Sequence, residues 1–304
     1  MSEPEAPAEA GPTGPIRVLL TGAGGQVGSA VRQRTPAGAT LVALDSRMLD
    51  VTDENAVRAA VAEARPNVIL NAAGYTGVDQ AESEPERAFS VNRDGPANLA
   101  AAALANGARL IHLSTDFVFD GAQGAPYGPD APCRPINVYG ASKRAGEEAV
   151  QALGGDSALV VRTSWVYAAR GHNFVLTMLR LLRERPEVRV VTDQIGSPTW
   201  AASLANALWA VTRRADLSGI HHWADAGVAS WFDLAVAIQE EGVALGLLSG
   251  CVPIHAVSTG DVPRPARRPS FSVLDTSLTT RALGMAPAHW RVNLRRMLRE
   301  VHAA

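Results

Sequence analysis

A tyrosine and a lysine stand four residues apart in the stretch Val-Tyr-Gly-Ala-Ser-Lys at 138–143. Residues at this spacing share one face of a helix. An ammonium beside a phenol stabilises the phenolate and lowers a phenol pKa that is normally about 10. Such a tyrosine can pass a proton at neutral pH. Tyr139 and Lys143 therefore predict a site that reduces a ketone or oxidises an alcohol, although a surface helix can carry the same two residues.

A glycine-rich turn near the amino end predicts a dinucleotide site. An apolar run at 16–20 leads into a G-x-x-G-x-x-G pattern at 22–28, and helical-looking sequence follows. Glycines let the backbone approach a pyrophosphate, and a helix N-terminus supplies free N–H groups and a positive dipole end. We expect the following residues to bind the cofactor: Gly22, Gly25, Gln26, Val27 and Gly28.

An acidic residue follows the second apolar run. Asp45 ends the run 41–44, 23 residues after Gly22, where a carboxylate can bind the adenosine ribose hydroxyls of NADH. Arg47 could instead pair with the 2′-phosphate of NADPH, so we expect the protein to use either cofactor. We also assign to cofactor binding the two residues that open the next loop, Asp50 and Val51.

Two more apolar runs end in residues suited to a ligand site. The run 67–71 is followed by Ala72, Ala73 and Gly74, whose small size would let the cofactor lie against the backbone. A turn without a ligand is the alternative. The run 109–113 leads to Thr115, whose hydroxyl could hydrogen-bond the substrate ketone and orient it, or could simply cap the loop.

The composition excludes several classes of protein. The chain has 304 residues, 47% of them hydrophobic and 19% charged, with a formal net charge of −2, which is typical of a soluble globular protein. A net charge of −2 does not favour binding to nucleic acid. No apolar run is long enough for a membrane span. Two cysteines and scattered histidines predict no disulfide framework and no metal site, and fit a cytoplasmic protein.

Repeated strand and helix patterns predict an α/β fold with a Rossmann-type, doubly wound parallel sheet. We expect a disordered tail at 1–15 and an NAD(P)-binding domain at 16–165. The remainder, 166–304, should form most of a smaller substrate-binding lobe and complete the fold. Within the first domain, Ser83 and Glu86 predict a capping box for one helix that reaches Asn106.

These motifs resemble the extended short-chain dehydrogenases/reductases, and among them the dTDP-4-dehydrorhamnose reductase family, from residue 16 to the C-terminus. The resemblance includes the blocks YTGVDQAE at 75–82, RTSWVY at 162–167 and DQIGSPTW at 193–200. It implies hydride transfer from NAD(P)H to the 4-keto group of a dTDP-sugar, giving dTDP-L-rhamnose. Tyr139 would then be the proton donor, Lys143 would lower its pKa and hold the nicotinamide ribose, and Thr115 would orient the carbonyl.

The resemblance also assigns the substrate side. Residues matching the family's sugar and nucleotide contacts are Val78, Thr115, Asp116, Trp165 and Arg268, with Arg267 as an alternative to Arg268 near the diphosphate. Asn92 matches a position that orders the lysine through water, or is an ordinary buried asparagine. The family further allows for Mg²⁺ and for a homodimer, and the sequence shows no Mg²⁺ site.

Two positions depart from the family's pattern. Phe117 stands where the family usually has tyrosine, and Phe271 where it has asparagine. Because two polar side chains that could bond the sugar are absent, a second function stays possible: a dTDP-dihydrostreptose synthase of an antibiotic pathway such as streptomycin biosynthesis. A 4,6-dehydratase is disfavoured because Asp116 is not followed by glutamate. A regulatory subunit related to that of methionine adenosyltransferase is disfavoured because the Thr, Tyr and Lys set is intact.

Overall fold

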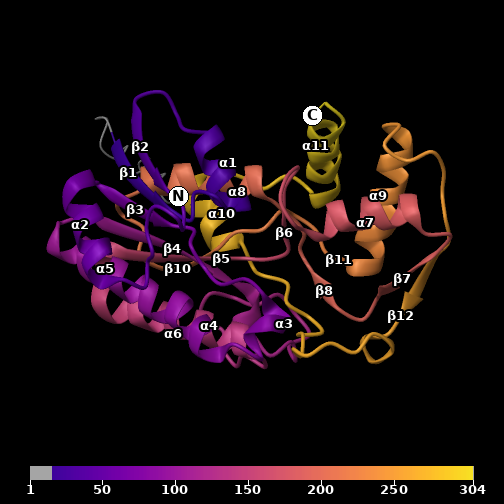
Figure 1. The fold of residues 1–304 in the computed structure, drawn as a ribbon, viewed down its shortest axis with the longest axis horizontal. Coiled ribbons are helices and arrows are strands. Elements are labelled where there is room, and N and C mark those ends of the chain that lie inside the picture. Colours follow the sequence, from indigo (N-terminus) through magenta and orange to yellow (C-terminus); the bar gives the residue numbers. More distant parts are fainter. Residues whose placement is uncertain (1–15, 304) are drawn as a thin grey trace, which may run out of the picture.

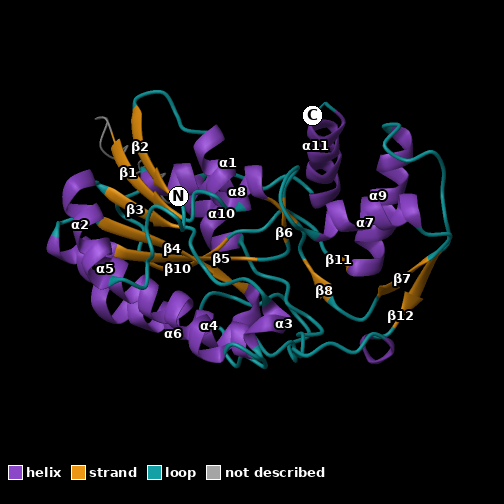
Figure 2. Cartoon of the chain, viewed as in Figure 1, coloured by secondary structure: helices purple, strands orange, loops and turns teal. Residues whose placement is uncertain are grey.

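The centre of the protein is a six-stranded parallel sheet, in a computed structural model that describes residues 16–303 (Figures 1 and 2). The strand order is β10-β5-β4-β3-β1-β2. The strands are β1 (Ile16–Thr21), β2 (Ala39–Leu44), β3 (Val68–Asn71), β4 (Arg109–Thr115), β5 (Ala158–Thr163) and β10 (Gly219–His222). The predicted tail at 1–15 lies outside the described residues.

The sheet is doubly wound. The chain moves outward from β1 to β2, then returns to the other side of β1 for β3 and continues to β4, β5 and β10. The order therefore reverses between β1 and β3, which is where ligands of such sheets bind, at the carboxyl ends of the strands. The predicted Rossmann-type fold is confirmed.

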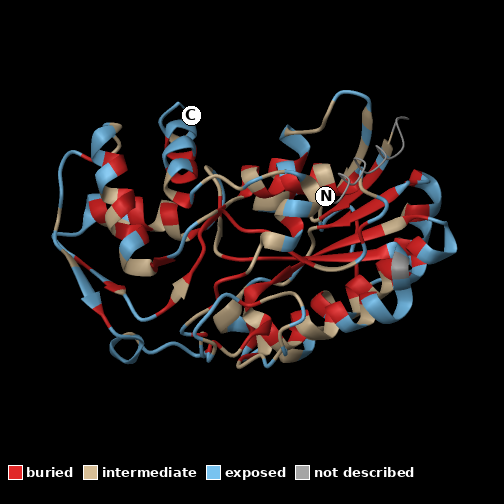
Figure 3. Cartoon of the chain, turned by 180° about the vertical axis from the view of Figure 1, so that it is seen from behind, coloured by how far each residue is buried: buried red, intermediate tan, exposed pale blue. Residues whose placement is uncertain are grey.

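Helices cover both faces of the sheet (Figure 1). One layer contains α1 (Gln26–Gln33), α8 (Ala201–Thr212) and α10 (Ser277–Leu283), and the other contains α2 (Glu54–Ala64), α5 (Gly95–Ala105) and α6 (Val138–Gly154). Because strand side chains alternate between faces, Val18 and Leu20 join the first core while Leu19 joins the second. Sheets buried on both faces need nearly continuous apolar strands, and Figure 3 shows the central strands as buried.

The region before β4 differs from the prediction. Instead of one regular helix, the chain forms α4 (Pro85–Phe89), a π-helical turn (Ser90–Asp94) and α5. The predicted capping box is wrong, because the N-cap position is Glu84 and the Ser83 hydroxyl bonds the Gln80 carbonyl instead. Proline at the first helical position needs no N–H partner, which explains how this helix begins without a side-chain cap.

A smaller lobe has its own apolar core, built mainly from α7 (Phe174–Glu184), α9 (Trp231–Ala244) and α11 (Trp290–His302). Beside them lie the paired strands β7 (Val188–Val191) with β12 (Ile254–Val257), and β8 (Ile195–Gly196) with β11 (Ala229–Ser230). The pair β6 (Val166–Tyr167) and β9 (Thr199–Trp200) lies between this lobe and the sheet. Within the same C-terminal half, α8, β10 and α10 return to the sheet.

Short helical segments complete the fold: α3 (Val78–Ala81), η2 (Asp116–Val118), η3 (Gly155–Ser157) and η4 (Thr259–Asp261). In the part of the chain from 16 to 303, no helix combines the length and the apolar character that a bilayer crossing requires.

Candidate active site

The glycine turn and the loop after β3 meet at the reversal point of the sheet. Gly22 has φ of +71°, and a Cβ added there would overlap the backbone of Ala72 and Ala73. A Cβ on Gly28 would overlap the Gly22 carbonyl oxygen. Only glycine therefore lets α1 and the β3 loop come this close together, and both loops present backbone where a cofactor is expected.

The N-terminus of α1 suits a pyrophosphate. Gly25 is its N-cap and supplies no side chain to bond the first N–H groups, so they are available to an anion. A hollow of about 280 Å³ begins at Gly24, Gly25 and Gln26 and extends to Arg170 and Gly171 of the smaller lobe. The residues present therefore fit a dinucleotide.

Gln26 also ties the glycine turn to the smaller lobe. Its Nε2 donates to the His172 carbonyl at 3.3 Å, and its Oε1 accepts from Asn173 Nδ2 at 2.9 Å. Asn173 in turn caps α7 through Leu176 N–H. The first turn of α1 and the first turn of α7 are thus held together by one side chain.

Asp45 and Arg47, which are predicted to bind the adenosine ribose or its 2′-phosphate, contact each other. Arg47 Nη2 lies 3.0 Å from Asp45 Oδ2, and the hydrogen bonds from Arg47 hold the pKa of the Asp45 carboxyl below its usual value. Asp50 accepts from the Thr52 hydroxyl at 2.8 Å, and Val51 is buried against Gly95. Their roles toward a cofactor stay predictions.

Thr115 lies at the carboxyl end of β4, where its hydroxyl already has local partners. It donates to Asp116 Oδ1 at 3.0 Å and accepts from Phe117 N–H at 3.2 Å. The loop-capping alternative is therefore present in the structure. Asp116 is 1% exposed, and burial raises its pKa to about 7, an effect that the nearby Ser272 and the Thr115 hydrogen bond oppose only in part.

Tyr139 lies on the first turn of α6, with Phe117 packed edge-on against its ring at a centroid distance of 5.5 Å. Burial raises the pKa of Tyr139 to about 12, although the nearby Thr115 hydroxyl opposes part of the change. The predicted lowering of this pKa by Lys143 is wrong for the structure described, because burial dominates and the lysine is engaged elsewhere.

Lys143 is 5% exposed, and its ammonium points at β4. Nζ donates to the Leu113 carbonyl at 2.6 Å and lies 3.4 Å from His112 Nε2. Burial lowers the pKa of Lys143 to about 8, and the charge of Glu147 offsets only part of that effect. Asn92 bonds the Tyr75 backbone and Ser142 directly, as expected for an ordinary buried asparagine.

Three of the predicted substrate residues, Trp165, Val78 and Arg268, lie outside the central sheet. Trp165 stacks on Trp231 with ring centroids 3.5 Å apart and an interplanar angle of 1°. Val78 begins α3. The neighbouring Asp79 accepts two hydrogen bonds from Arg268, from Nη1 to Oδ1 at 3.0 Å and from Nη2 to Oδ2 at 2.9 Å. Arg268 is therefore occupied by an ion pair, whereas Arg267 is exposed.

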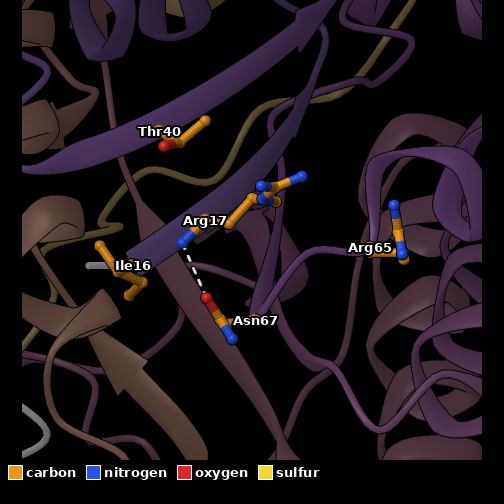
Figure 4. Close-up of a pocket in the computed structure, with 5 residues that line it drawn as sticks. All are labelled: Ile16, Arg17, Thr40, Arg65 and Asn67. Carbon is orange, nitrogen blue, oxygen red and sulfur yellow. Dashed lines mark hydrogen bonds between the residues drawn. The ribbon is translucent and has the colours of Figure 1, made fainter. Parts of the chain in front are cut away.

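A larger hollow of about 420 Å³ lies at the opposite, amino end of the strands (Figure 4). Figure 4 shows Arg17 donating its backbone N–H to Asn67 Oδ1, at 2.8 Å. We do not assign the site there, because parallel sheets bind ligands at their carboxyl ends and no predicted residue lines it.

Within residues 16–303, no group of three or more His, Cys, Asp or Glu side chains is placed to hold a metal. This result gives no support to the Mg²⁺ that the resemblance allows for. His221 and His222 are buried in β10, and Cys133 and Cys251 are unpaired in the part of the chain described.

The sequence reasoning missed four residues around the site: Thr21, Asn71, His112 and Trp231. Thr21 and Asn71 end β1 and β3, His112 lies within β4, and all three are on the face that α6 covers. That parity of polar positions was a signal that could have found them. Nothing local marks Trp231, because its partner Trp165 is 66 positions away in the chain.

The doubly wound sheet, the glycine turn and the Tyr139, Lys143 and Thr115 set together define an oxidoreductase of the short-chain dehydrogenase/reductase type. The family model described as RmlD substrate binding domain matches residues 16–303. A dTDP-4-dehydrorhamnose reductase of Streptomyces griseus is 45% identical over 289 residues, covering 91% of each chain. The chain belongs to the dTDP-4-dehydrorhamnose reductase family.

Other relatives agree with this family. The spore coat polysaccharide biosynthesis protein SpsK of Bacillus subtilis is 40% identical over 290 residues, covering 95% of this chain and 99% of the relative. The crystal structure of a Bacillus anthracis dTDP-4-dehydrorhamnose reductase in complex with NADP matches with a TM-score of 0.88 and 38% identity. It covers 94% of this chain and 99% of that one.

Proposed function

We propose that the protein reduces the 4-keto group of dTDP-4-dehydro-6-deoxy-L-mannose with NAD(P)H and so forms dTDP-L-rhamnose. The single observation that carries the proposal is the placement of Tyr139 beside Thr115 at the carboxyl edge of the sheet, in a chain of this reductase family. The NADP complex of the Bacillus anthracis relative supports the choice of cofactor.

The pKa of Tyr139 suits reduction. A phenol with a pKa of about 12 keeps its proton at neutral pH, and a ketone that receives hydride becomes an alkoxide, which is basic enough to take that proton. NAD(P)H supplies the hydride when it is bound. Thr115 is then the residue that orients the carbonyl by a hydrogen bond, and Lys143 bonds the nicotinamide ribose.

The substrate side supports a sugar ring in contact with an aromatic surface. The flat Trp165 and Trp231 stack offers such a surface. Arg267, which is exposed on the loop that bonds the Asn137 cap of α6, is better placed than Arg268 to meet a diphosphate. The unpaired cysteines support a reducing, cytoplasmic setting. The homodimer stays a prediction.

The test is to mix the purified protein with NADPH and the 4-keto-L-rhamnose nucleotide made by a 3,5-epimerase. We expect NADPH oxidation and a sugar whose NMR spectrum is that of dTDP-L-rhamnose. The matched control omits the epimerase, so that the 4-keto sugar has the other configuration at C3 and C5. No oxidation with either sugar would reject the reductase activity and favour a regulatory role.

A second candidate product is dTDP-dihydrostreptose, as in streptomycin-type antibiotic pathways. Phe117 packs directly on Tyr139 and cannot hydrogen-bond the sugar. An unpaired buried hydroxyl costs about 1 to 3 kcal/mol, which is enough to change the preferred ring. A branched five-membered sugar in the same NMR experiment would establish this candidate and leave the reductase mechanism intact.

A further inference from the structure

A row of three polar side chains crosses the sheet toward the lysine. Thr21 is the register partner of Asn71, and Asn71 is the register partner of His112, on the adjacent strands β1, β3 and β4. Their exposures are 1%, 0% and 0%. Thr21 Oγ1 donates to Asn71 Oδ1 at 2.7 Å, and Asn71 Nδ2 lies 2.9 Å from His112 Nδ1.

The backbone fixes which way the Asn71 amide points. Ala73 N–H donates to Asn71 Oδ1 at 3.0 Å, and a backbone N–H cannot accept. The amide oxygen must therefore face Ala73, and Nδ2, which can only donate, must face His112. Nδ1 of His112 then has to be the acceptor. A neutral imidazole with an accepting Nδ1 carries its proton on Nε2.

That proton faces the lysine. His112 Nε2 is 3.4 Å from Lys143 Nζ. An N–H can donate to the lone pair of an amine, but it opposes an ammonium, which has no lone pair. Burial and the nearby Lys143 charge both lower the pKa of His112 well below its usual value, so the imidazole is neutral across the working pH range.

The other groups that face Lys143 are few. From β4 it meets the Leu113 carbonyl, and from the loop after β3 it meets Gly74, which has no side chain. From its own helix the charge of Glu147 acts on it, but the carboxylate oxygens of Glu147 bond Arg162 and Arg144. Among the side chains of residues 16–303, His112 is the one with which Nζ makes a hydrogen-bond contact.

We propose that His112 is a positioning residue for Lys143: Asn71 locks its imidazole as the Nε2–H tautomer, and this N–H favours the amine form of the lysine over the ammonium. Asn71 holds His112, and His112 acts on Lys143. The row of Thr21, Asn71 and His112 is buried along its whole length.

The consequence for catalysis rests on the proposed function. When Tyr139 gives its proton to the alkoxide, the phenolate must regain one before the next turnover. A lysine that can both release and regain its proton near neutral pH is able to take part in that return. A lysine with a pKa near the usual 10.4 would hold its proton more firmly.

The sequence makes a direct test possible. Of the 28 Lys and Arg residues, 27 are arginines, so Lys143 is the one lysine of the chain. Full-length protein labelled with ¹³C-lysine gives a single side-chain signal next to Nζ, whose titration by NMR reports Lys143 alone. We expect a midpoint of about 8.

Replacing the donor should move that midpoint. In His112→Leu the opposing N–H is absent while the burial remains, and we expect the midpoint to rise by about one pH unit, the equivalent of one ordinary hydrogen bond. The matched control is Thr21→Val, which removes a buried hydrogen bond from the same row but leaves Ala73 N–H to orient Asn71. Its midpoint should stay at that of the parent. An unchanged midpoint in His112→Leu would overturn the proposal.

A second measurement needs no folded variant. In the parent protein labelled with ¹⁵N-histidine, we expect one buried imidazole with an unprotonated Nδ1 and a protonated Nε2, unchanged from pH 6 to 9. A His112 in the Nδ1–H tautomer, or doubly protonated, would reject the locked arrangement. Both measurements are made without substrate, so an absence of keto-sugar reduction would reject the proposed function and leave this result standing.

Discussion

Two buried charged residues lie one turn apart on α6, and their surroundings differ. Glu147 is 0% exposed and accepts from Arg162 at 2.7 Å through both oxygens, and from Arg144 at 3.0 Å. Lys143 is 5% exposed and has a carbonyl oxygen and a neutral imidazole as its partners. One charge is matched by opposite charge, and the other is not.

The pKa values follow this difference. Burial alone would raise the pKa of Glu147, but the hydrogen bonds and charge of Arg162 outweigh it and keep the carboxyl below its usual value. Burial lowers the pKa of Lys143 to about 8, with little to oppose it. The same helix thus carries a charge that is fixed at neutral pH and one that is able to change. We expect the fixed charge to matter for stability and the changeable one for chemistry.

The largest effect should come from the chemical side. Tyr139→Phe removes the proposed proton donor and no other atom, so we expect turnover to fall by about a hundredfold to ten-thousandfold. The free energy of unfolding and the binding of NADPH, measured by quenching of tryptophan fluorescence, should stay near those of the parent. Reduction of the keto-sugar within a few-fold of the parent rate would show that Tyr139 is not the donor.

The opposite outcome is expected for the fixed charge. Glu147→Gln leaves Arg162, which is 0% exposed, without its counter-ion, and breaking a buried pair costs about 3 to 5 kcal/mol. Urea denaturation would measure this loss. The control is Glu148→Gln, whose side chain is 60% exposed and whose loss should cost less than about 1 kcal/mol. If the two variants have the same free energy of unfolding, the buried Glu147 charge does not stabilise the fold more than the exposed Glu148 charge.

The pH dependence should separate the two residues further. Because the pKa of Lys143 is lowered to about 8 in the folded chain, the unfolded chain binds more protons between that pH and about 10.4. The contribution of Lys143 to the free energy of unfolding therefore rises with pH in this window, by up to about 3 kcal/mol.

The charge on Lys143 that is proposed to hold the ribose disappears in the same window, so activity should fall above pH 8. Lys143→Met should lose the rise in stability, measured by denaturation from pH 7.5 to 10.5. An equal slope in parent and variant would show that another group titrates there.

The smallest effect concerns the cofactor. Asp45 and Arg47 form an exposed pair at 3.0 Å, and each favours a different cofactor. We expect kcat/KM for NADH and NADPH to differ only modestly. Steady-state rates with both cofactors measure the ratio, and a preference beyond about a thousandfold, or roughly 4 kcal/mol, would rule out dual use.

The sheet and the glycine turn could be predicted because their signals are local. Each strand is a short apolar run, and the glycine pattern at 22–28 needs only its own backbone to form the turn. The acidic Asp45 follows in the next run at the expected spacing. These features depend on neighbours in the chain, and sequence patterns record such neighbours well.

The electrostatics of the site could not be predicted, because they depend on distant partners. The pKa of Tyr139 was expected to fall beside Lys143, but the lysine points at Leu113 and His112, about 30 positions earlier. Arg268 is predicted to bind a diphosphate, and in the structure its side chain pairs with Asp79, 189 positions away, a contact that no local pattern records. The predicted capping box of Ser83 and Glu86 does not form, because the Ser83 hydroxyl donates to the Gln80 carbonyl instead.

Because the one lysine of the chain is buried, the rate of its chemical modification can report the rate of a local opening of the structure. An amine-reactive acylating reagent has a single ε-amine to attack, and that amine is 5% exposed. Acylation of Lys143 must therefore wait until the edge of the sheet beside α6 opens. The rate at which mass spectrometry finds the modified peptide measures how often this opening occurs, as amide hydrogen exchange does for a backbone N–H.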